Sequence, residues 1–442
     1  MKTVLLSCYE MGRQPFGLAS PAAWLRSGGH AVSCIDLSIE QLSPQLIEQA
    51  GLVCFYLPMH TATRLALPLI ERVREINRGA HLCGYGLYAP LNATYLREKG
   101  VDTILGGEFE AALLSLADTL DSARAPASRE SSIGLDRLRF LTPHRSLLPP
   151  PSSYAKLRHG ADVRLAGYTE ASRGCKHLCR HCPVVPVYNG AFRVVQPDVV
   201  LADIRQQVEA GVEHISFGDP DFLNGPAHAR RIVEALHRDH PNLTYDATIK
   251  IEHLRRHSDF ASLLKDTGCL FVTSAVESLD DGVLAKLQKG HTRDDFYRVV
   301  ELFRKLDLTL APTFIAFTPW TTLATYREFL AALRELDLIR NVSSIQLALR
   351  LLIPAGSRML ELPEIRSVVT DFDPPALLHR WQHAAPAIDR LAEDALKIAG
   401  RKGSRPQLFA QIWERAHGAP LYEPLDLLPR AAIPYMDEPW YC

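Results

Sequence analysis

The stretch Ser172-Arg-Gly-Cys-Lys-His-Leu-Cys-Arg-His-Cys-Pro183 decides how the chain is organised. Its cysteines, Cys175, Cys179 and Cys182, have the spacing C-x3-C-x2-C. Three thiolates from one short loop can hold three irons of a [4Fe–4S] cluster and leave the fourth iron open to another ligand. The loop is also basic, and positive charge favours the ligating thiolate form; the residues concerned are Arg173, Lys176 and Arg180. The spacing therefore predicts a cluster site on this loop.

Zinc is the main alternative at the same loop. Structural zinc usually takes four ligands, often as two separated pairs. His177 or His181 could complete such a set, although both lie very close in sequence to the cysteines. The three-cysteine spacing favours the cluster, and the zinc alternative stays open at this point.

The loop resembles the signature of radical S-adenosylmethionine (SAM) enzymes, in which C-x3-C-x2-C follows a strand, here expected at 166–172. Members usually have an aromatic residue before the third cysteine; His181 stands there and keeps a flat ring. The resemblance implies that the amine and carboxylate of SAM chelate the open iron. It also implies that an electron from the cluster then releases a 5′-deoxyadenosyl radical.

Length, charge and composition limit the classes of function. A chain of 442 residues should hold two or three domains. A net charge of −1 gives no basic footprint for nucleic acid. No signal peptide and no apolar stretch of membrane-spanning length are recognisable. Nine cysteines without such signals are typical of a reduced, cytoplasmic protein.

Residues 1–122 alternate between apolar runs, at 3–8, 30–37, 51–57 and 80–85, and helical patterns. This alternation predicts an α/β domain with a doubly wound, Rossmann- or flavodoxin-like parallel sheet, whose ligands bind at the carboxyl ends of the strands.

This half resembles the cobalamin (B12)-binding domain that precedes many radical SAM domains. The matching residues are Gly28, Asp36 and the segment Val101-Asp-Thr-Ile-Leu-Gly-Gly-Glu-Phe-Glu110. The D-x-H-x-x-G motif that supplies a lower histidine to cobalt is absent, and His60 is the only histidine at a plausible strand end. The resemblance therefore leaves two possibilities, a bound cobalamin or a scaffold that has lost it.

A Ser-, Arg- and Pro-rich stretch at 123–162 predicts a linker. Beyond it, about six strand–helix units over 163–385 predict a partial (β/α)6 TIM-type barrel, with chemistry at the C-terminal strand ends. The later strands are expected at 214–217, 243–251, 269–276, 312–317 and 344–352.

Two motifs resemble the family's SAM-binding segments. Gly218-Asp219-Pro220 follows the second barrel strand, where the resemblance places Asp219 against the methionine amine. Val276-Glu277-Ser278 with Lys289-Gly-His-Thr292 resembles G-x-E-S…K-G-x-T and implies that Glu277 lies near the nucleoside. An ordinary turn and a helix-terminal carboxylate are the alternatives.

Three further residues are candidate contacts of SAM. Lys250 and Glu252 share one face of the expected strand 243–251, so they are candidates for the ribose or carboxylate, with a solvated edge as the alternative. Arg350, with the segment 354–357, resembles the late-barrel segment that flanks the adenine, although a plain turn also explains it.

Residues 386–442 are predicted to form a helical extension and a cysteine tail. The ending Met-Asp-Glu-Pro-Trp-Tyr-Cys442 resembles a radical SAM group whose chains end in C-C-A-E-P or C-U-A-E-P, where U is selenocysteine. The resemblance implies a catalytic role for Cys442 and a selenocysteine directly after it, at a codon otherwise read as stop. A frayed terminus is the alternative.

The sequence therefore predicts an enzyme that uses a [4Fe–4S] cluster and SAM to modify a small molecule, by methyl transfer if cobalamin is bound. One alternative is aminocarboxypropyl transfer to arsenic or selenium held by the tail cysteine. Another is a zinc- or cluster-containing binding protein without turnover. The expected partners are the substrate and an electron donor such as flavodoxin or ferredoxin, with no nucleic acid and no membrane.

Overall fold

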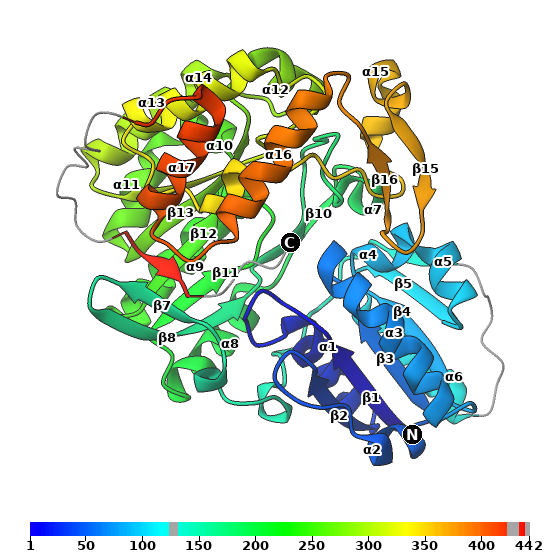
Figure 1. Ribbon diagram of the computed structural model, residues 1–442. Helices are drawn as coiled ribbons and strands as arrows, with labels where there is room; N and C mark the ends of the chain where they lie inside the picture. The colour runs from blue at the N-terminus through cyan, green and yellow to red at the C-terminus, as the bar shows by residue number, and fades with distance from the viewer. Residues whose placement is uncertain (123–130, 422–432, 438–442) are drawn as a thin grey trace.

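The computed structural model describes residues 1–122, 131–421 and 433–437. Two β-sheets organise these residues (Figure 1). The first belongs to the N-terminal part, and the second curls through the larger C-terminal part. Together they confirm the predicted fold class, an α/β chain with a doubly wound sheet followed by a partial barrel. No helix among the described residues is long and apolar enough to cross a membrane.

The first sheet has the strand order β2-β1-β3-β4-β5-β6, and all of its pairs are parallel. Its strands are β1 Lys2–Ser7, β2 Ala31–Asp36, β3 Leu52–Tyr56, β4 His81–Tyr85, β5 Thr103–Gly107 and β6 Ser132–Gly134. The helices are α1 Phe16–Ser27, α2 Pro44–Glu48, α3 His60–Ile76, α4 Tyr88–Leu91, α5 Ala93–Glu98 and α6 Glu110–Asp121. Strand β3 is buried along its whole length, because helices cover both faces. The order reverses at β1 and β3, so a ligand crevice is expected at their carboxyl ends.

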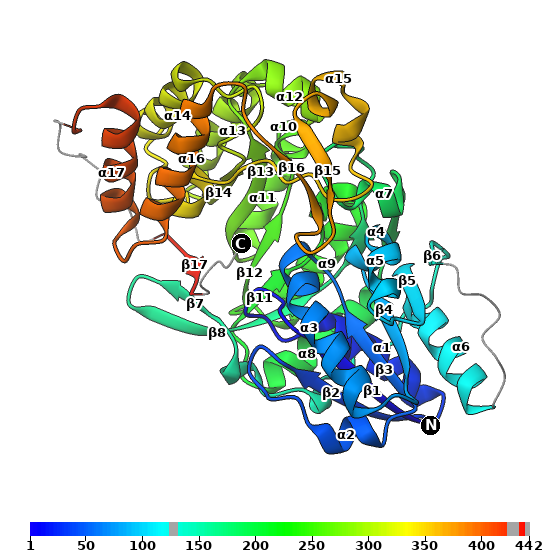
Figure 2. The same cartoon turned by 45° about the vertical axis from the view of Figure 1, so that its right-hand side comes forward.

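The second sheet has the order β14-β13-β12-β11-β8-β7-β17. Five strands are parallel: β8 Asp162–Thr169, β11 His214–Phe217, β12 Thr244–Thr248, β13 Cys269–Glu277 and β14 Thr309–Phe314. The helices between them are α8 Pro197–Glu209, α9 Pro226–Asp239, α10 Ile251–Arg256, α11 Ser258–Asp266, α12 Asp281–Leu287 and α13 Arg293–Lys305, and α14 Leu323–Glu335 follows β14. Two antiparallel strands extend the β8 edge, β7 Lys156–His159 and β17 Tyr435–Met436 (Figure 2).

Two predicted strands differ from the structure. The segment expected to form a strand at 344–352 begins as the 3-10 helix η4 Ser344–Leu347, and only Arg350 makes a parallel bridge, to Phe317. The strand expected at 243–251 ends at Thr248, because α10 begins at Ile251. Lys250 and Glu252 therefore lie at the start of a helix, not on one face of a strand.

The end of the barrel region returns to the N-terminal part through the hairpin β15 Val369–Asp373 and β16 Leu378–Trp381 (Figure 1). Leu377 at the hairpin turn is completely buried in the apolar core of the first sheet. His60 Nε2 lies 2.7 Å from the Ala376 carbonyl oxygen. The hairpin thus connects the two parts.

The remaining elements are η1 Arg145–Leu147, η2 Pro151–Ser153, β9 Ser172–Gly174, α7 Val185–Tyr188, β10 Phe192–Val194, η3 Phe222–Asn224, η5 Arg358–Glu361, α15 Pro363–Arg366, α16 Pro386–Ala399 and α17 Arg405–His417.

Candidate functional site

The cysteine loop follows β8 at the carboxyl edge of the half-barrel. The segment that leads into it, residues 171–174, is held by several contacts. β9 pairs antiparallel with β10. Gly174 has φ +72°, and a Cβ there would lie 2.4 Å from the Tyr188 ring, so this position requires glycine. The backbone N–H of Ala171 and the hydroxyl of Ser172 both donate to the carboxylate of Asp219. The loop therefore starts from a fixed position.

All three cysteines of the loop are free, and Cys175 and Cys179 are buried. Burial raises the pKa of Cys182 to about 12 and also raises the pKa of Cys175, and each thiol is close enough to the others to add to the effect. Two buried lysines act in the opposite direction and lower thiol pKa values. Lys250 Nζ lies 3.7 Å from Cys179 Sγ, and the charge of Lys289 lowers the pKa of Cys182. Three thiols and two cations are a suitable environment for a cluster of soft metal ions.

The basic residues expected beside the thiols have other partners. Arg173 is buried and forms ion pairs with Glu108, Glu110 and Glu170, at N···O distances of 3.4, 2.6 and 2.7 Å. Its role is thus to join the loop to the carboxyl end of the first sheet. Arg180 donates to the Lys286 carbonyl oxygen. The compensating charges come instead from Lys250 and Lys289.

Glu277 lies at the end of β13 and contacts the cysteine loop. Its Oε1 is 3.2 Å from His181 Nε2 and 3.4 Å from Lys289 Nζ. Burial alone would raise the pKa of Glu277, but Lys289 and His181 outweigh it and bring the value to about 2. The residue also has φ +72°, a conformation that side chains other than glycine rarely adopt. Glu277 and His181, two candidate site residues that the sequence did not pair, therefore meet at the loop.

A second polar group lies on the other side of Cys175. Ligand atoms of Cys175, His177 and Asp221 all lie within 4.8 Å of one another, close enough to hold a metal ion. Burial would raise the pKa of Asp221, yet His177 and His253 lower it to about 2. Glu252 lies 3.4 Å from both His177 Nδ1 and Lys250 Nζ. This arrangement keeps the zinc alternative open.

Two residues predicted to contact SAM, Asp219 and Arg350, already have partners within the protein. Both oxygens of Asp219 accept hydrogen bonds from the start of the cysteine loop, and burial raises its pKa to about 7. The guanidinium of Arg350 donates to Asp389 at 2.6 Å and stacks 4.0 Å from the centre of the Trp381 ring. Cys442 lies outside the described residues.

Two cavities adjoin at this edge. One, of about 360 Å³, occupies the lumen of the half-barrel, and Gly218, Asp219 and Tyr435 are among its walls. The other, of about 200 Å³, lies between the first sheet and the barrel, where Glu10, Gly86 and Gly107 line it. The two share five wall residues, which are Met11, Arg13, Tyr168, Gly218 and Pro220. A Cβ on Gly218 would lie 1.8 Å from the Tyr168 hydroxyl oxygen, so the ring of Tyr168 covers Gly218.

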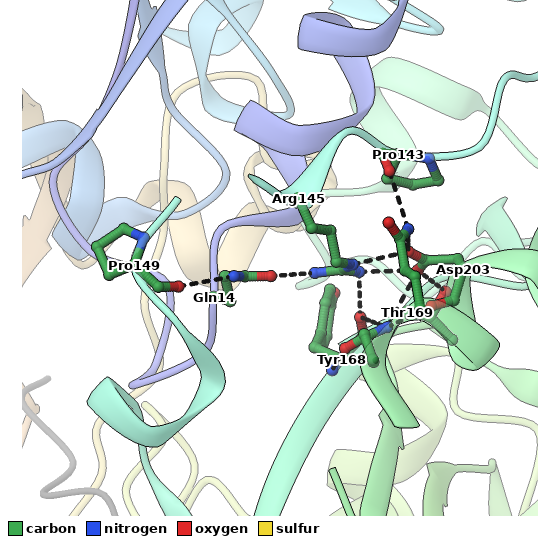
Figure 3. Close-up of polar contacts among 9 residues, drawn as sticks. Gln14, Pro143, Arg145, Pro149, Tyr168, Thr169 and Asp203 are labelled. Atoms are coloured by element: carbon green, nitrogen blue, oxygen red, sulfur yellow. Dashed lines mark hydrogen bonds and ion pairs between the residues drawn. The ribbon is translucent and has the colours of Figure 1, made fainter. Parts of the chain in front are cut away.

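Arg145 was not expected from the sequence, because a Pro-rich segment carries no signal for a buried cation. Its guanidinium bonds both oxygens of Asp203 at 2.7 and 2.8 Å (Figure 3). It also donates to Gln14 Oε1 and to the Tyr168 carbonyl oxygen. Thr169 donates to the same aspartate. Arg145 thus fixes the end of β8, from which the cysteine loop departs.

Residues 169–338 match the radical SAM superfamily. This stretch contains the cysteine loop, Asp219 and Glu277. The chain therefore contains a radical SAM domain. That domain is the catalytic unit of an enzyme superfamily, and it makes the chain an enzyme.

Two curated proteins resemble this chain over most of its length. The hopanoid C-3 methylase of Methylococcus capsulatus is 25% identical over 70% of this chain and 62% of its own length. An uncharacterised methyltransferase of Pyrococcus horikoshii is 22% identical over 73% of this chain and 74% of its own. The aligned region thus spans less than two thirds of the hopanoid methylase.

Two solved structures share the fold. The radical SAM methyltransferase TsrM from Kitasatospora setae, solved with cobalamin and a [4Fe–4S] cluster, aligns with a TM-score of 0.60 at 18% identity, over 76% of this chain and 73% of its own. The cobalamin-dependent radical SAM enzyme OxsB, solved with aqua-cobalamin, aligns with a TM-score of 0.69 at 14% identity, over 89% and 66%. At such identities the likeness concerns the fold alone.

Proposed function

We propose that this chain is a radical SAM methyltransferase that acts on a small molecule, with Cys175, Cys179 and Cys182 as the ligands of a [4Fe–4S] cluster. The observation that carries the proposal is the set of three free thiols on one loop at the barrel edge, beside two buried lysines. A cluster bound there supplies the electron that cleaves SAM. The protein's part is to hold three thiolates, balance their charge and exclude water.

The residues around the loop divide this work. Lys250 and Lys289 balance thiolate charge in a site with little solvent. Asp219 positions the loop, because each of its oxygens accepts a hydrogen bond from the start of the loop. Its contact with the methionine amine stays a prediction. Glu277 holds His181 beside the third cysteine. In this proposal SAM lies across Gly218 and Pro220, where the lumen and interface cavities meet, and the lumen beside the barrel strands is left to the substrate.

An anaerobic assay tests this function. The reconstituted protein is incubated with SAM and dithionite, and the nucleoside products are separated. 5′-Deoxyadenosine or S-adenosylhomocysteine supports the proposal, and methylthioadenosine would support the aminocarboxypropyl alternative. Absence of all three products would overturn both. That alternative and the selenocysteine prediction both depend on Cys442 and its surroundings, so they stay predictions.

Single replacements of the cysteines by alanine provide the site-specific test. Each of Cys175→Ala, Cys179→Ala and Cys182→Ala is expected to abolish the brown absorbance and SAM cleavage, because two thiolates retain a cluster poorly. Replacement of buried Cys269, which lies on β13, by alanine is the matched control and should leave the iron content unchanged. A cluster retained after any loop replacement would contradict the ligand assignment.

A corrinoid at the interface cavity is the second part of the proposal. Glu10 offers a buried oxygen without a hydrogen-bond partner among the described residues, and burial raises its pKa well above the usual value. A neutral carboxyl of this kind can donate to the amide side chains of a corrin ring. Gly86 and Gly107, both with positive φ, bring bare backbone to the same cavity. A corrinoid bound there supplies a carrier for the methyl group.

The room for a corrinoid is limited. The cavity of about 200 Å³ is smaller than typical pockets for drug-sized ligands, so the sheet and barrel edges must part to admit it. No histidine lies in the described wall of this cavity, and His60 Nε2 lies against the Ala376 carbonyl oxygen. Binding is therefore expected without a histidine on the lower face of the cobalt.

Incubation with hydroxocobalamin, followed by desalting and an absorbance spectrum, tests this binding. Met59→Trp, in the cavity wall, is expected to reduce cobalamin retention, whereas Leu65→Trp, 48% exposed on the helix α3 that follows Met59, should not. A colourless wild-type protein would leave the N-terminal sheet as a scaffold.

Zinc binding is a second candidate function, favoured by the closeness of Cys175, His177 and Asp221. The two candidates differ in the residues they need. A zinc site would lose its metal in His177→Ala and keep it in Cys182→Ala, whereas a cluster requires Cys182. Metal analysis of both variants, purified without oxygen, distinguishes them.

A further inference from the structure

Three polar residues lie on neighbouring strands inside the half-barrel, where an apolar lining would be expected. His214 and Ser216 are completely buried, and Asp246 is 5% exposed. They come from β11 and β12, whose intervening residues Ile215 and Tyr245 pack against the helices. Because successive side chains of a strand point to opposite faces, the three polar residues face the lumen.

Only one oxygen of the Asp246 carboxylate is satisfied. His214 Nε2 lies 2.9 Å from Oδ1, and the Ser216 hydroxyl donates to the same oxygen. The ring of His214 is oriented in turn by Thr244, whose Oγ1 is 2.9 Å from Nδ1. Oδ2 has no hydrogen-bond partner in the described part of the chain, and Asp246 lines the lumen cavity of about 360 Å³. The unpaired oxygen thus belongs to a rigidly held carboxylate at the cavity wall.

The cations of the cavity wall do not pair with this carboxylate. Arg13 stacks 4.9 Å from the centre of the Tyr168 ring. Arg405 donates to the Arg340 carbonyl oxygen at 2.6 Å and lies over Tyr435. A buried carboxylate without full compensation is costly, and proteins retain such groups where a ligand completes them. The partner that Asp246 Oδ2 lacks is therefore a hydrogen-bond donor supplied by a ligand.

We propose that the lumen cavity binds a small amine with an apolar body and that its ammonium group donates to Asp246 Oδ2. Much of the remaining wall is apolar and includes Phe271, Ala311, Pro312 and Met436. The volume lies in the range of pockets for small organic ligands. The inference rests on the proposed function, whose substrate it narrows to small amines.

Calorimetric titration of the full-length protein, with its cluster reconstituted, tests the inference. The probes are 2-phenylethylamine and 3-phenylpropionate, which share a ring and a similar length but carry opposite charges. The amine should bind at least about tenfold more tightly than the acid. Asp246→Asn should weaken amine binding by about ten- to a hundredfold, the usual effect of losing a charged hydrogen bond. Asp259→Asn, 77% exposed, should bind the amine as the wild type does.

Ala311→Leu serves as an independent variant, because it fills the cavity without touching the carboxylate. It should also weaken amine binding, and it keeps the inference testable if Asp246→Asn does not fold. Equal binding of the acid, no binding of the amine, or unchanged amine affinity in Asp246→Asn or Ala311→Leu would overturn the inference. The titrations contain neither SAM nor reductant. Failure here therefore leaves the proposed SAM chemistry intact, and a protein that binds the amine without cleaving SAM would refute only the proposed function.

Discussion

Replacement of Arg145 by alanine should destabilise the protein more than replacement of almost any other arginine. The guanidinium is only 7% exposed and bonds two oxygens of Asp203, which is 1% exposed. Its removal leaves a buried negative charge and takes the donor from Gln14 Oε1, whereas the Tyr168 carbonyl oxygen keeps its bond from Gln207. Breaking a buried pair in this way typically costs about 3–5 kcal/mol. The hydrogen bonds from Thr169, Gln206 and Gln207 to Asp203 remain, so we expect the lower half of that range.

Urea unfolding of the cluster-free protein, followed by circular dichroism, measures the change in the free energy of unfolding. Arg158→Ala is the matched control, because Arg158 is 46% exposed in its pair with Asp437 and such pairs contribute at most about 1 kcal/mol. Adding Asp203→Ala to Arg145→Ala should restore part of the loss, since it removes the uncompensated charge. If Arg145→Ala costs no more than Arg158→Ala, the account of Arg145 as the residue that fixes β8 is wrong.

Two further predictions concern charge around the cysteine loop. The pKa of Asp219 is raised to about 7 by burial, so the folded protein holds a proton that the unfolded chain releases above pH 3.8. Wild-type stability should therefore fall, by roughly 4 kcal/mol at most, as the pH rises from about 4 to 7, and urea unfolding of Asp219→Asn should lack this fall. Lys250→Met should slow alkylation of Cys175 about three- to tenfold, as read by mass spectrometry, because the charge of Lys250 lowers the pKa of that thiol. Lys176→Met should not slow it, because Lys176 Nζ donates to the Asn224 carbonyl oxygen.

The sequence predicted both sheets because their strands are short apolar runs between helices. For β1 to β4, the expected and observed limits agree within about two residues. The predicted strand 344–352 failed because nearly every residue in it is apolar or small, a composition that a buried 3-10 helix shares. The pairing of β17 with β7 was beyond local reasoning, since Tyr435 and Arg158 are far apart in the chain.

The candidate site was easiest to predict where one motif contains all of its parts, as the cysteine loop does. The contact between His181 and Glu277 was not expected, because the sequence placed Glu277 near the nucleoside. Spacing does not say where a long side chain points. Arg173 was expected beside the thiols, but it forms ion pairs with three glutamates instead. Asp246 was missed because its environment is made by a neighbouring strand and not by its own segment.

The ring of Tyr168, which stands in the wall between the lumen and interface cavities, has a consequence for the design of inhibitors. Compounds that occupy either cavity alone must compete separately with the ligand of that cavity. A bivalent compound would carry one group for each cavity, joined by a linker that passes the edge of this ring. Once the first group is bound, binding of the second group is intramolecular, so the compound gains affinity without any new contact. The linker must pass the ring of Tyr168 where it covers Gly218. The selectivity of such a compound for this enzyme would then depend on how well its linker fits around the ring of Tyr168, which lines both cavities.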